Sequence, residues 1–391
     1  MLNLPIYLDN HATTRLDPRV LEAMLPYFSE HYGNASSVNH TYGEQAMAAV
    51  DAARDQLAQM IHAQHREIVF TCGATESNNT AIKGVAAAYE AKGRHLITAV
   101  TEHPSVLGPC EHLERKGWSI TRLPVDGFGQ VTVEQVAQAL RPETVLVSIM
   151  LANNEVGTIQ PIAAIGALCK KHHVLLHTDA TQAVGKMPVD VQQLQVDLLS
   201  MSAHKLYGPK GVGALFIRRK DPRVRLEPLL DGGGQEHHLR SGTLNTPGIV
   251  GLGMACTLAQ AEMAAESARI QGLRDRLYEG LKQRIPELYL NGHPTERLAG
   301  NLNVSIGYVQ GEALLLALPS LALSSGAACA TKSAEPSPVL RAMGRGAELA
   351  DASLRFGIGR FNTDEEIDFV LAELPKQVEK LRSLSSAWKH R

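Results

Sequence analysis

Short apolar, β-branched runs alternate with longer amphipathic segments between residues 66 and 218. The runs, which have the composition of strands, are residues 67–71, 95–100, 145–150, 174–178, 198–202 and 212–217. The intervening segments have helical spacing of apolar residues and include residues 80–91, 106–116, 133–140 and 162–172. This alternation predicts an α/β fold in which helices cover both faces of a largely parallel sheet. Ligands of such sheets bind beyond the carboxyl ends of the strands.

The pattern changes after about residue 262, which indicates a second, smaller domain. The predicted elements are a helix at 266–285, strands near 288–290, 301–306, 321–324 and 353–358, and helices near 312–318 and from 363. This mixture is typical of an α+β domain. We therefore expect an N-terminal arm (residues 1–15), a large domain (16–262) and a small C-terminal domain (263–391). The arm is expected to fold back onto one of the two domains.

Composition narrows the classes of partner. The 391 residues are 44% hydrophobic and 20% charged, with a formal net charge of -2, as in ordinary globular proteins. This balance gives no electrostatic reason to expect a nucleic acid or an anionic membrane as a direct partner. The most apolar stretches, 244–261 and 313–330, are interrupted by Pro and Gly and are shorter than a ~20-residue membrane span. Because the N-terminus has no signal-peptide pattern, we expect a cytoplasmic protein.

The cysteines and histidines do not form metal-binding motifs. The five cysteines are widely spaced and contain no CxxC pair; they are Cys72, Cys110, Cys169, Cys256 and Cys329. Such spacing argues against a disulfide framework and a zinc ribbon. Most are expected to be small core residues, whereas Cys329 stands apart because of the small residues around it. We predict no metal site.

Two charged residues follow consecutive predicted strands. Lys205 comes after the strand that ends at Ser202, and an amine in this place can form a Schiff base with an aldehyde cofactor. Asp179 comes after the preceding strand, where a carboxylate can keep a pyridine nitrogen protonated. Each residue also has a simpler interpretation, a solvated lysine and a helix N-cap. Lys210 competes with Lys205, but its position between Pro209 and Gly211 indicates a turn.

A third segment, Gly73-Ala74-Thr75-Glu76, follows a strand and opens a helix. Free N–H groups and a hydroxyl at a helix N-terminus can bind a phosphate, although a merely capped helix has the same pattern. Mononucleotide and dinucleotide motifs are absent from the sequence. One lysine, one acid and one phosphate cradle on an α/β sheet together indicate pyridoxal 5'-phosphate (PLP) as the cofactor.

These segments closely resemble the cysteine desulfurases, PLP enzymes of the class-V aminotransferase family with the aspartate-aminotransferase-like transferase fold, PLP fold type I. The resemblance covers essentially the whole chain. Its motifs are YLDNHATT at 7–14, GATESN at 73–78, TEH at 101–103, NNEVG at 153–157, HTDATQ at 177–182, SAHK at 202–205, RSGT at 240–243 and SSGAAC at 324–329. The last motif and the long segment that follows it resemble the IscS/NifS-like branch, and another branch carries Arg-x-Gly-His-x-Cys instead.

The resemblance implies a role for each matching residue in cofactor binding. Lys205 would hold PLP and then move the Cα proton, and His103 would stack on the ring and assist proton transfer. Asp179 would pair with the ring nitrogen, and Gln182 would bond the ring hydroxyl. The remaining implied cofactor contacts are those of Ala74, Thr75, Asn154, Ser202, His204 and Thr243. Thr243 resembles a residue that reaches the phosphate of the partner subunit, which implies a homodimer.

On the substrate side, the resemblance implies that Asn154 and Arg355 grip L-cysteine. Arg355 suits a bidentate clamp on the α-carboxylate, although an ordinary strand-end arginine is the simpler interpretation. Cys329 would attack the substrate sulfur as a thiolate. The product would be L-alanine and a Cys329 persulfide, which is donated to an iron–sulfur scaffold protein or another sulfur acceptor.

Two alternatives stay open at this point. One is another PLP-dependent reaction, such as that of a selenocysteine lyase or a cysteine or cystine lyase; the Cys329 motif argues against the thiol-independent forms. The other is a binding platform for scaffold, regulatory or tRNA-thiolation proteins. The chain departs from the family pattern at His11, at Pro104-Ser105 and at its basic C-terminal end. The choice of acceptor is therefore the least constrained inference.

Overall fold

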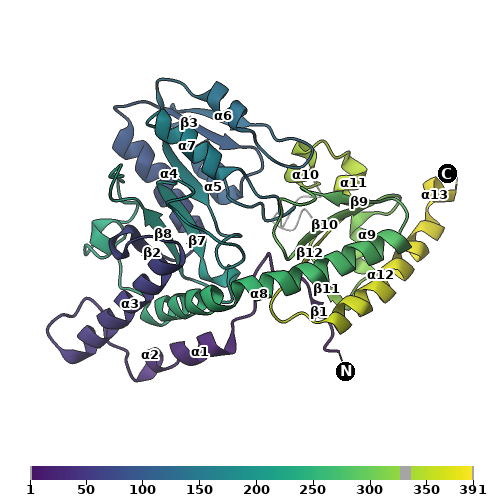
Figure 1. Ribbon diagram of the computed structural model, residues 1–391, viewed down its shortest axis with the longest axis horizontal. Helices are drawn as coiled ribbons and strands as arrows, with labels where there is room; N and C mark the ends of the chain where they lie inside the picture. Colours follow the sequence, from purple (N-terminus) through teal and green to yellow (C-terminus); the bar gives the residue numbers. More distant parts are fainter. Residues whose placement is uncertain (1, 326–335, 390–391) are drawn as a thin grey trace.

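The computed structural model describes residues 2–325 and 336–389, so Cys329 lies outside the described residues. Figure 1 shows a large sheet with its helices beside a smaller sheet, and the long helix α8 (Thr246–Arg284) passes along both. The α/β class predicted from the strand–helix alternation is confirmed.

The large sheet has seven strands in the order β2-β8-β7-β6-β5-β3-β4. They are β2 (Ile68–Thr71), β3 (His95–Ala99), β4 (Ser119–Leu123), β5 (Thr144–Ser148), β6 (Leu175–Asp179), β7 (Leu198–Ser202) and β8 (Gly213–Ile217). Strand β8 runs antiparallel to both of its neighbours, β2 and β7, and all other neighbouring strands of this sheet are parallel. The six strands expected from the sequence are present within two residues of their predicted bounds. The edge strand β4 was not predicted.

Apolar side chains cover both faces of this sheet. In β2, Ile68 and Phe70 belong to one core and Val69 to the other, as the two-residue period of a strand requires. The second face packs against α4 (Ala74–Tyr89) and α5 (Pro104–Arg115). The first packs against α1 (Pro18–Met24), α3 (Thr41–Met60), α6 (Val133–Ala139), α7 (Ile162–Lys171) and the first part of α8, with the short α2 (Pro26–Ser29) contacting α8. Burial on both faces explains the nearly continuous apolar runs of these strands.

The small sheet is antiparallel, with the order β12-β10-β9. Its strands are β9 (Leu288–Asn291), β10 (Asn301–Ile306) and β12 (Ser353–Gly357). Around it lie α9 (Gly311–Leu316), α10 (Pro338–Ala342), α11 (Ala347–Asp351), α12 (Asp364–Leu384) and α13 (Ser386–Lys389). The predicted strand at 321–324 is only β11 (Leu321–Ala322), which pairs with β1 (Ile6–Tyr7) rather than with this sheet.

Helix α8 has 39 residues and begins 20 positions before the helix predicted at 266–285. Asn245 accepts a hydrogen bond from the N–H of Gly248 and thereby caps it. Its early apolar residues, such as Leu252, lie in the core of the large sheet, and Leu277 and Leu281 lie in the core of the small one. Among the described helices, only α8 is long and apolar enough to suit a membrane span; half of its most apolar window is buried, as in the core helix of a soluble protein.

The N-terminal arm contacts both parts of the chain. Ile6 and Leu8 are buried in the core of the small sheet, next to β11. Farther along the arm, the N–H of Thr14 donates to the carbonyl of His204 in the large domain. The domain limits at residues 15 and 262 remain a proposal, because α8 crosses the second of them without a break.

Candidate active site

A cavity of about 680 Å³ lies beyond the carboxyl ends of the parallel strands. The predicted site residues that line it are Ala74, Thr75, His103, Asn154, Asp179, Gln182, Ser202, His204, Lys205 and Arg355. Thr243 is exposed and does not line it, and Cys329 lies outside the described residues. Ten residues scattered over more than 280 positions therefore meet at the edge of the sheet where ligands were expected.

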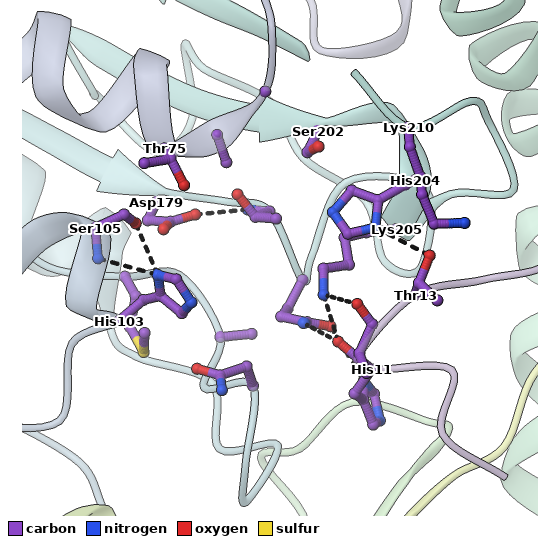
Figure 2. Close-up of a pocket in the computed structure, with 18 of the residues that line it drawn as sticks. His11, Thr13, Thr75, His103, Ser105, Asp179, Ser202, His204, Lys205 and Lys210 are labelled. Atoms are coloured by element: carbon purple, nitrogen blue, oxygen red, sulfur yellow. Dashed lines mark hydrogen bonds between the residues drawn. The ribbon is translucent and has the colours of Figure 1, made fainter. Parts of the chain in front are cut away.

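Lys205 lies in the short turn η2 (Ala203–Lys205), directly after β7. Its Nζ donates hydrogen bonds to the main-chain oxygens of His11 (2.6 Å) and Ala12 (2.5 Å), which Figure 2 shows as two dashed lines. The amine is thus held inside the cavity by the N-terminal arm. Lys210 also lines the cavity, but it is exposed in the turn before Gly211.

Asp179 is the last residue of β6 and is buried. One carboxylate oxygen, Oδ1, accepts from the N–H of Thr181 at 3.0 Å, so the residue stabilises a turn and not a helix N-terminus. The other, Oδ2, accepts from Nδ2 of Asn78 at 2.7 Å. A carboxylate held in this way at the cavity is suited to a protonated ring nitrogen.

His103 is the N-cap of α5, and its Nδ1 accepts from the N–H of Ser105. Burial lowers the pKa of the imidazole, Asp179 acts in the opposite direction, and Lys205 lowers it further. The ring is therefore held neutral at neutral pH. Pro104 occupies the first helical position, so α5 begins two residues earlier than predicted.

The N-terminus of α4 opens onto the same cavity. Its N-cap is Gly73, at a φ of 152°, and among the described residues no side chain caps the first turn. A Cβ on Gly213 would lie 2.7 Å from the Cα of Gly73, so β8 needs glycine there to let this turn pack. The hydroxyls of Thr75 and Ser202 lie around the helix end (Figure 2). An uncapped helix N-terminus with nearby hydroxyls fits a phosphate.

His204 and Gln182 complete the cofactor side of the cavity. Burial lowers the pKa of His204 to about 4, with Lys205 contributing, so its ring is uncharged. The Oε1 of Gln182 lies 3.1 Å from Nδ1 of His11 and accepts from Nζ of Lys186 at 2.9 Å. Its Nε2 donates to the carbonyl of His11 at 2.9 Å. The orientation of the Gln182 amide is thus fixed by three contacts.

Arg355, in β12, lines the opposite side of the cavity and is only 3% exposed. Its Nη2 donates to Oδ1 of Asp9 at 2.7 Å and its Nη1 to the carbonyl of Asn154 at 3.0 Å. Its Nε is buried and has no partner among the described residues. A guanidinium has five N–H groups, so this one retains donors for a carboxylate.

The functions of three residues at or next to the cavity could not be predicted from the sequence. Asp9 and Asn78 lie inside quoted motifs, and Ser105 lies in a noted departure from the family pattern. Only the structure places Asp9 against Arg355 and connects Asn78 and Ser105 to His103 and Asp179. The motifs were the available signal, but they carried no information about which side chains touch.

The donor set of this cavity fits PLP: a reachable amine, a buried carboxylate, a neutral histidine and an uncapped helix N-terminus. A class-V aminotransferase family model matches residues 6–370. This chain belongs to the class-V aminotransferase family. It is a PLP-dependent enzyme, as that family and the donor set of the cavity indicate.

Similarity to individual proteins places the chain in the IscS/NifS-like cysteine desulfurase branch of this family. The chain is 54% identical over 384 residues to cysteine desulfurase IscS of Anaeromyxobacter dehalogenans (strain 2CP-C), covering 98% of this chain and 95% of the relative. It is 54% identical over 389 residues to IscS of Shewanella sp. (strain MR-4), with 99% and 96% covered. Among solved structures, a NifS-like protein aligns with a TM-score of 0.90 at 38% identity (96% and 100% covered). SspA in complex with cysteine aligns with a TM-score of 0.81 at 37% identity (91% and 99% covered).

Proposed function

We propose that this protein takes sulfur from L-cysteine, leaving L-alanine and a persulfide on Cys329 that is passed to an acceptor. One observation carries the proposal: a single cavity unites Lys205 and Asp179 with Arg355, whose guanidinium retains donors for an amino-acid carboxylate. The similarity to SspA, whose structure was solved with cysteine, supports the same substrate.

On the cofactor side, Lys205 would hold PLP and move the proton at the substrate Cα, and His103 would face the ring. Asp179 would pair with the ring nitrogen and Gln182 with the ring hydroxyl. The backbone at Ala74, with the side chains of Thr75, Ser202 and His204, would bind the phosphate. The bound cofactor supplies an electron sink for negative charge at Cα.

On the substrate side, Arg355 binds the α-carboxylate with its remaining N–H groups, and Asn154 lies beside it. The Cys329 thiolate attacks the substrate sulfur, the S–S bond forms and the C–S bond breaks. The electron pair stays on carbon and is protonated, so alanine leaves and both sulfurs remain on the enzyme.

A second copy of this chain would complete the site. Thr243 is exposed and lies off its own cavity, where it could serve a neighbouring subunit. An apolar surface, exposed in the single chain, covers the segment from α1 to the start of α3; its large members are Leu21, Leu25, Phe28, Tyr32, Val38 and Tyr42. Such a patch is typical of a homodimer interface. Light scattering of the purified protein tests the dimer.

The sulfur acceptor is an iron–sulfur scaffold protein or a thiolation protein, and the reaction takes place in the cytoplasm.

The decisive experiment incubates the PLP-loaded protein with L-cysteine and reductant and quantifies alanine and sulfide. Cys329→Ala should abolish both while the cofactor absorbance stays. Cys72→Ser, which alters a thiol lining the same cavity, is the matched control and should retain activity. Pyruvate and ammonia, or full activity of Cys329→Ala, would instead identify a lyase.

A further inference from the structure

A row of three hydrogen bonds joins His103 to Asp179, the two groups proposed to lie next to the cofactor ring. The Asn78 amide Nδ2 donates to Oδ2 of Asp179 at 2.7 Å and to Oγ of Ser105 at 2.8 Å. The Ser105 Oγ lies 2.7 Å from Nδ1 of His103. Asn78 and Ser105 are buried and neither lies in a loop, because they belong to α4 and α5.

The chemistry of the N–H groups determines which atom donates and which accepts in each of these hydrogen bonds. The main-chain N–H of Ser105 points at Nδ1 of His103 at 3.1 Å, and an N–H can only donate, so Nδ1 is an acceptor. The Asn78 NH₂ group also donates, so the Ser105 hydroxyl accepts from it and keeps its own proton for Nδ1. A neutral imidazole whose Nδ1 accepts carries its proton on Nε2. Figure 2 shows the His103 ring between Ser105 and the interior of the cavity.

We propose that Asn78 and Ser105 are positioning residues that hold His103 as the Nε2–H tautomer and fix its ring relative to Asp179. The use of this tautomer in catalysis rests on the proposed function; the tautomer itself does not. Through these hydrogen bonds, residues of α4 and α5 fix the positions of the His103 ring and the Asp179 carboxylate before a ligand binds. Nε2 is then the atom that presents a proton to the cavity.

The groups around His103 determine whether its pKa rises or falls when the Ser105 hydroxyl is removed. Burial and Lys205 lower the pKa of His103, and Asp179 raises it. Donation by the Ser105 hydroxyl to Nδ1 favours the neutral ring. Removing this hydroxyl should therefore raise the pKa of His103, by about half to one unit for one neutral hydrogen bond. The main-chain N–H of Ser105 remains in every variant, so part of the bias toward Nε2–H persists.

The test is ¹⁵N NMR of histidine rings in the full-length, PLP-loaded protein, with the His103 signals assigned by His103→Gln. Parent protein should show the Nε2–H tautomer over the neutral pH range. Ser105→Ala should raise the His103 pKa and mix the tautomers, and Asn78→Leu should shift it in the same direction. Ser105→Thr keeps a hydroxyl and should restore the parent titration. Ser119→Ala, a change on the edge strand β4, should leave it unchanged.

A parent ring with its proton on Nδ1, or a Ser105→Ala titration identical to that of the parent, overturns the proposal. If the pKa of His103 shifts in Ser105→Ala but not in Asn78→Leu, Asn78 has no positioning role for His103. The same experiment on cofactor-free protein separates this result from the activity. A correct tautomer in a protein that makes no alanine would contradict the proposed function and leave the positioning role standing.

Discussion

Asp9 and Arg355 lie 346 positions apart in the sequence and form a 2.7 Å ion pair at the cavity. The pair connects the N-terminal arm to β12, and the same two segments are joined by a β-bridge between Asp9 and Gly357. Arg355 is almost fully buried, so Asp9 both neutralises its charge and fixes the direction of its free N–H groups. The arm therefore contributes to the wall of the same cavity as Arg355.

Asp9→Asn should weaken cysteine binding. The amide still accepts a hydrogen bond but lacks the charge that makes this one strong, so the KM for L-cysteine should rise about fivefold, with a smaller change in kcat. Steady-state alanine production measures both constants. Asp364→Asn, which removes the charge of an exposed pair with Arg276, is the control and should change neither. A lower KM would mean that Asp9 competes with the substrate for Arg355.

Glu155 predicts a pH-dependent stability. It is 8% exposed, its Oε2 accepts from the Ser337 hydroxyl at 2.5 Å, and burial raises its pKa to about 7 from an ordinary 4.5. Between these values the folded state binds more protons than the unfolded state. The stability contributed by this group is therefore present below pH 4.5 and is lost as the pH rises through 7.

Glu155→Gln removes this titration and keeps an acceptor for Ser337. The variant should gain about 1–3 kcal/mol relative to the parent on going from pH 5 to pH 8. Denaturant unfolding of both proteins at the two pH values measures the difference. Glu348→Gln, at an exposed site, should show no such gain. Equal pH dependence in parent and Glu155→Gln would contradict the assignment.

Breaking the buried ion pair of Arg54 and Glu236 by removing one partner should destabilise the protein strongly. Both residues are buried, with Nη2 and Oε1 2.6 Å apart, and Oε2 of Glu236 also accepts from the N–H of Phe70 at 2.7 Å. Glu236→Ala leaves the buried guanidinium with only the more distant and half-exposed carboxylate of Asp51, 3.9 Å from its Nε, and should cost about 3–5 kcal/mol of unfolding free energy. The double variant Arg54→Met/Glu236→Leu should cost less than Glu236→Ala alone. Thermal and denaturant unfolding compare the three proteins.

The thiol of Cys72 should react slowly with electrophiles although the residue as a whole is exposed. Burial of the sulfur first, then the hydrogen bond and charge of Glu76, raise its pKa. In a Cys329→Ala background, Glu76→Gln should therefore speed alkylation of Cys72 by iodoacetamide about three- to tenfold at neutral pH. Mass spectrometry of the labelled peptide gives the rate. Glu262→Gln, on the exposed face of α8, should leave the rate as it was.

The sequence predicted the large sheet well because its central strands are buried on both faces and therefore stand out as apolar runs. The strand β4 was missed because Ser119–Leu123 contains only two apolar residues among serine, threonine and arginine, and only Leu123 is buried. The start of α8 was missed because its glycines disfavour a helix locally. Two of them, Gly251 and Gly253, lie against Met24 and Ala53, so tertiary packing decides the outcome.

Residues of the candidate site could be predicted where a motif contains a charged side chain at or just after the end of a strand, as with Asp179 and Lys205. The residues that hold these groups were not, because their role arises from contacts between segments far apart in the chain. Asn78 reaches Asp179 across 101 positions, and Gln182 reaches His11 across 171. Nothing in the local sequence of α4 indicates that the Asn78 amide bonds both Asp179 and Ser105.

Helix α8 has a consequence for how this protein folds. Because one uninterrupted helix supplies side chains to both cores, neither core is complete without the other half of that helix. Fraying of the helix in its middle would remove support from both sheets together. The two halves should therefore melt in a single cooperative transition, and fragments separated at residue 262 should recover a native fold only when they are produced together.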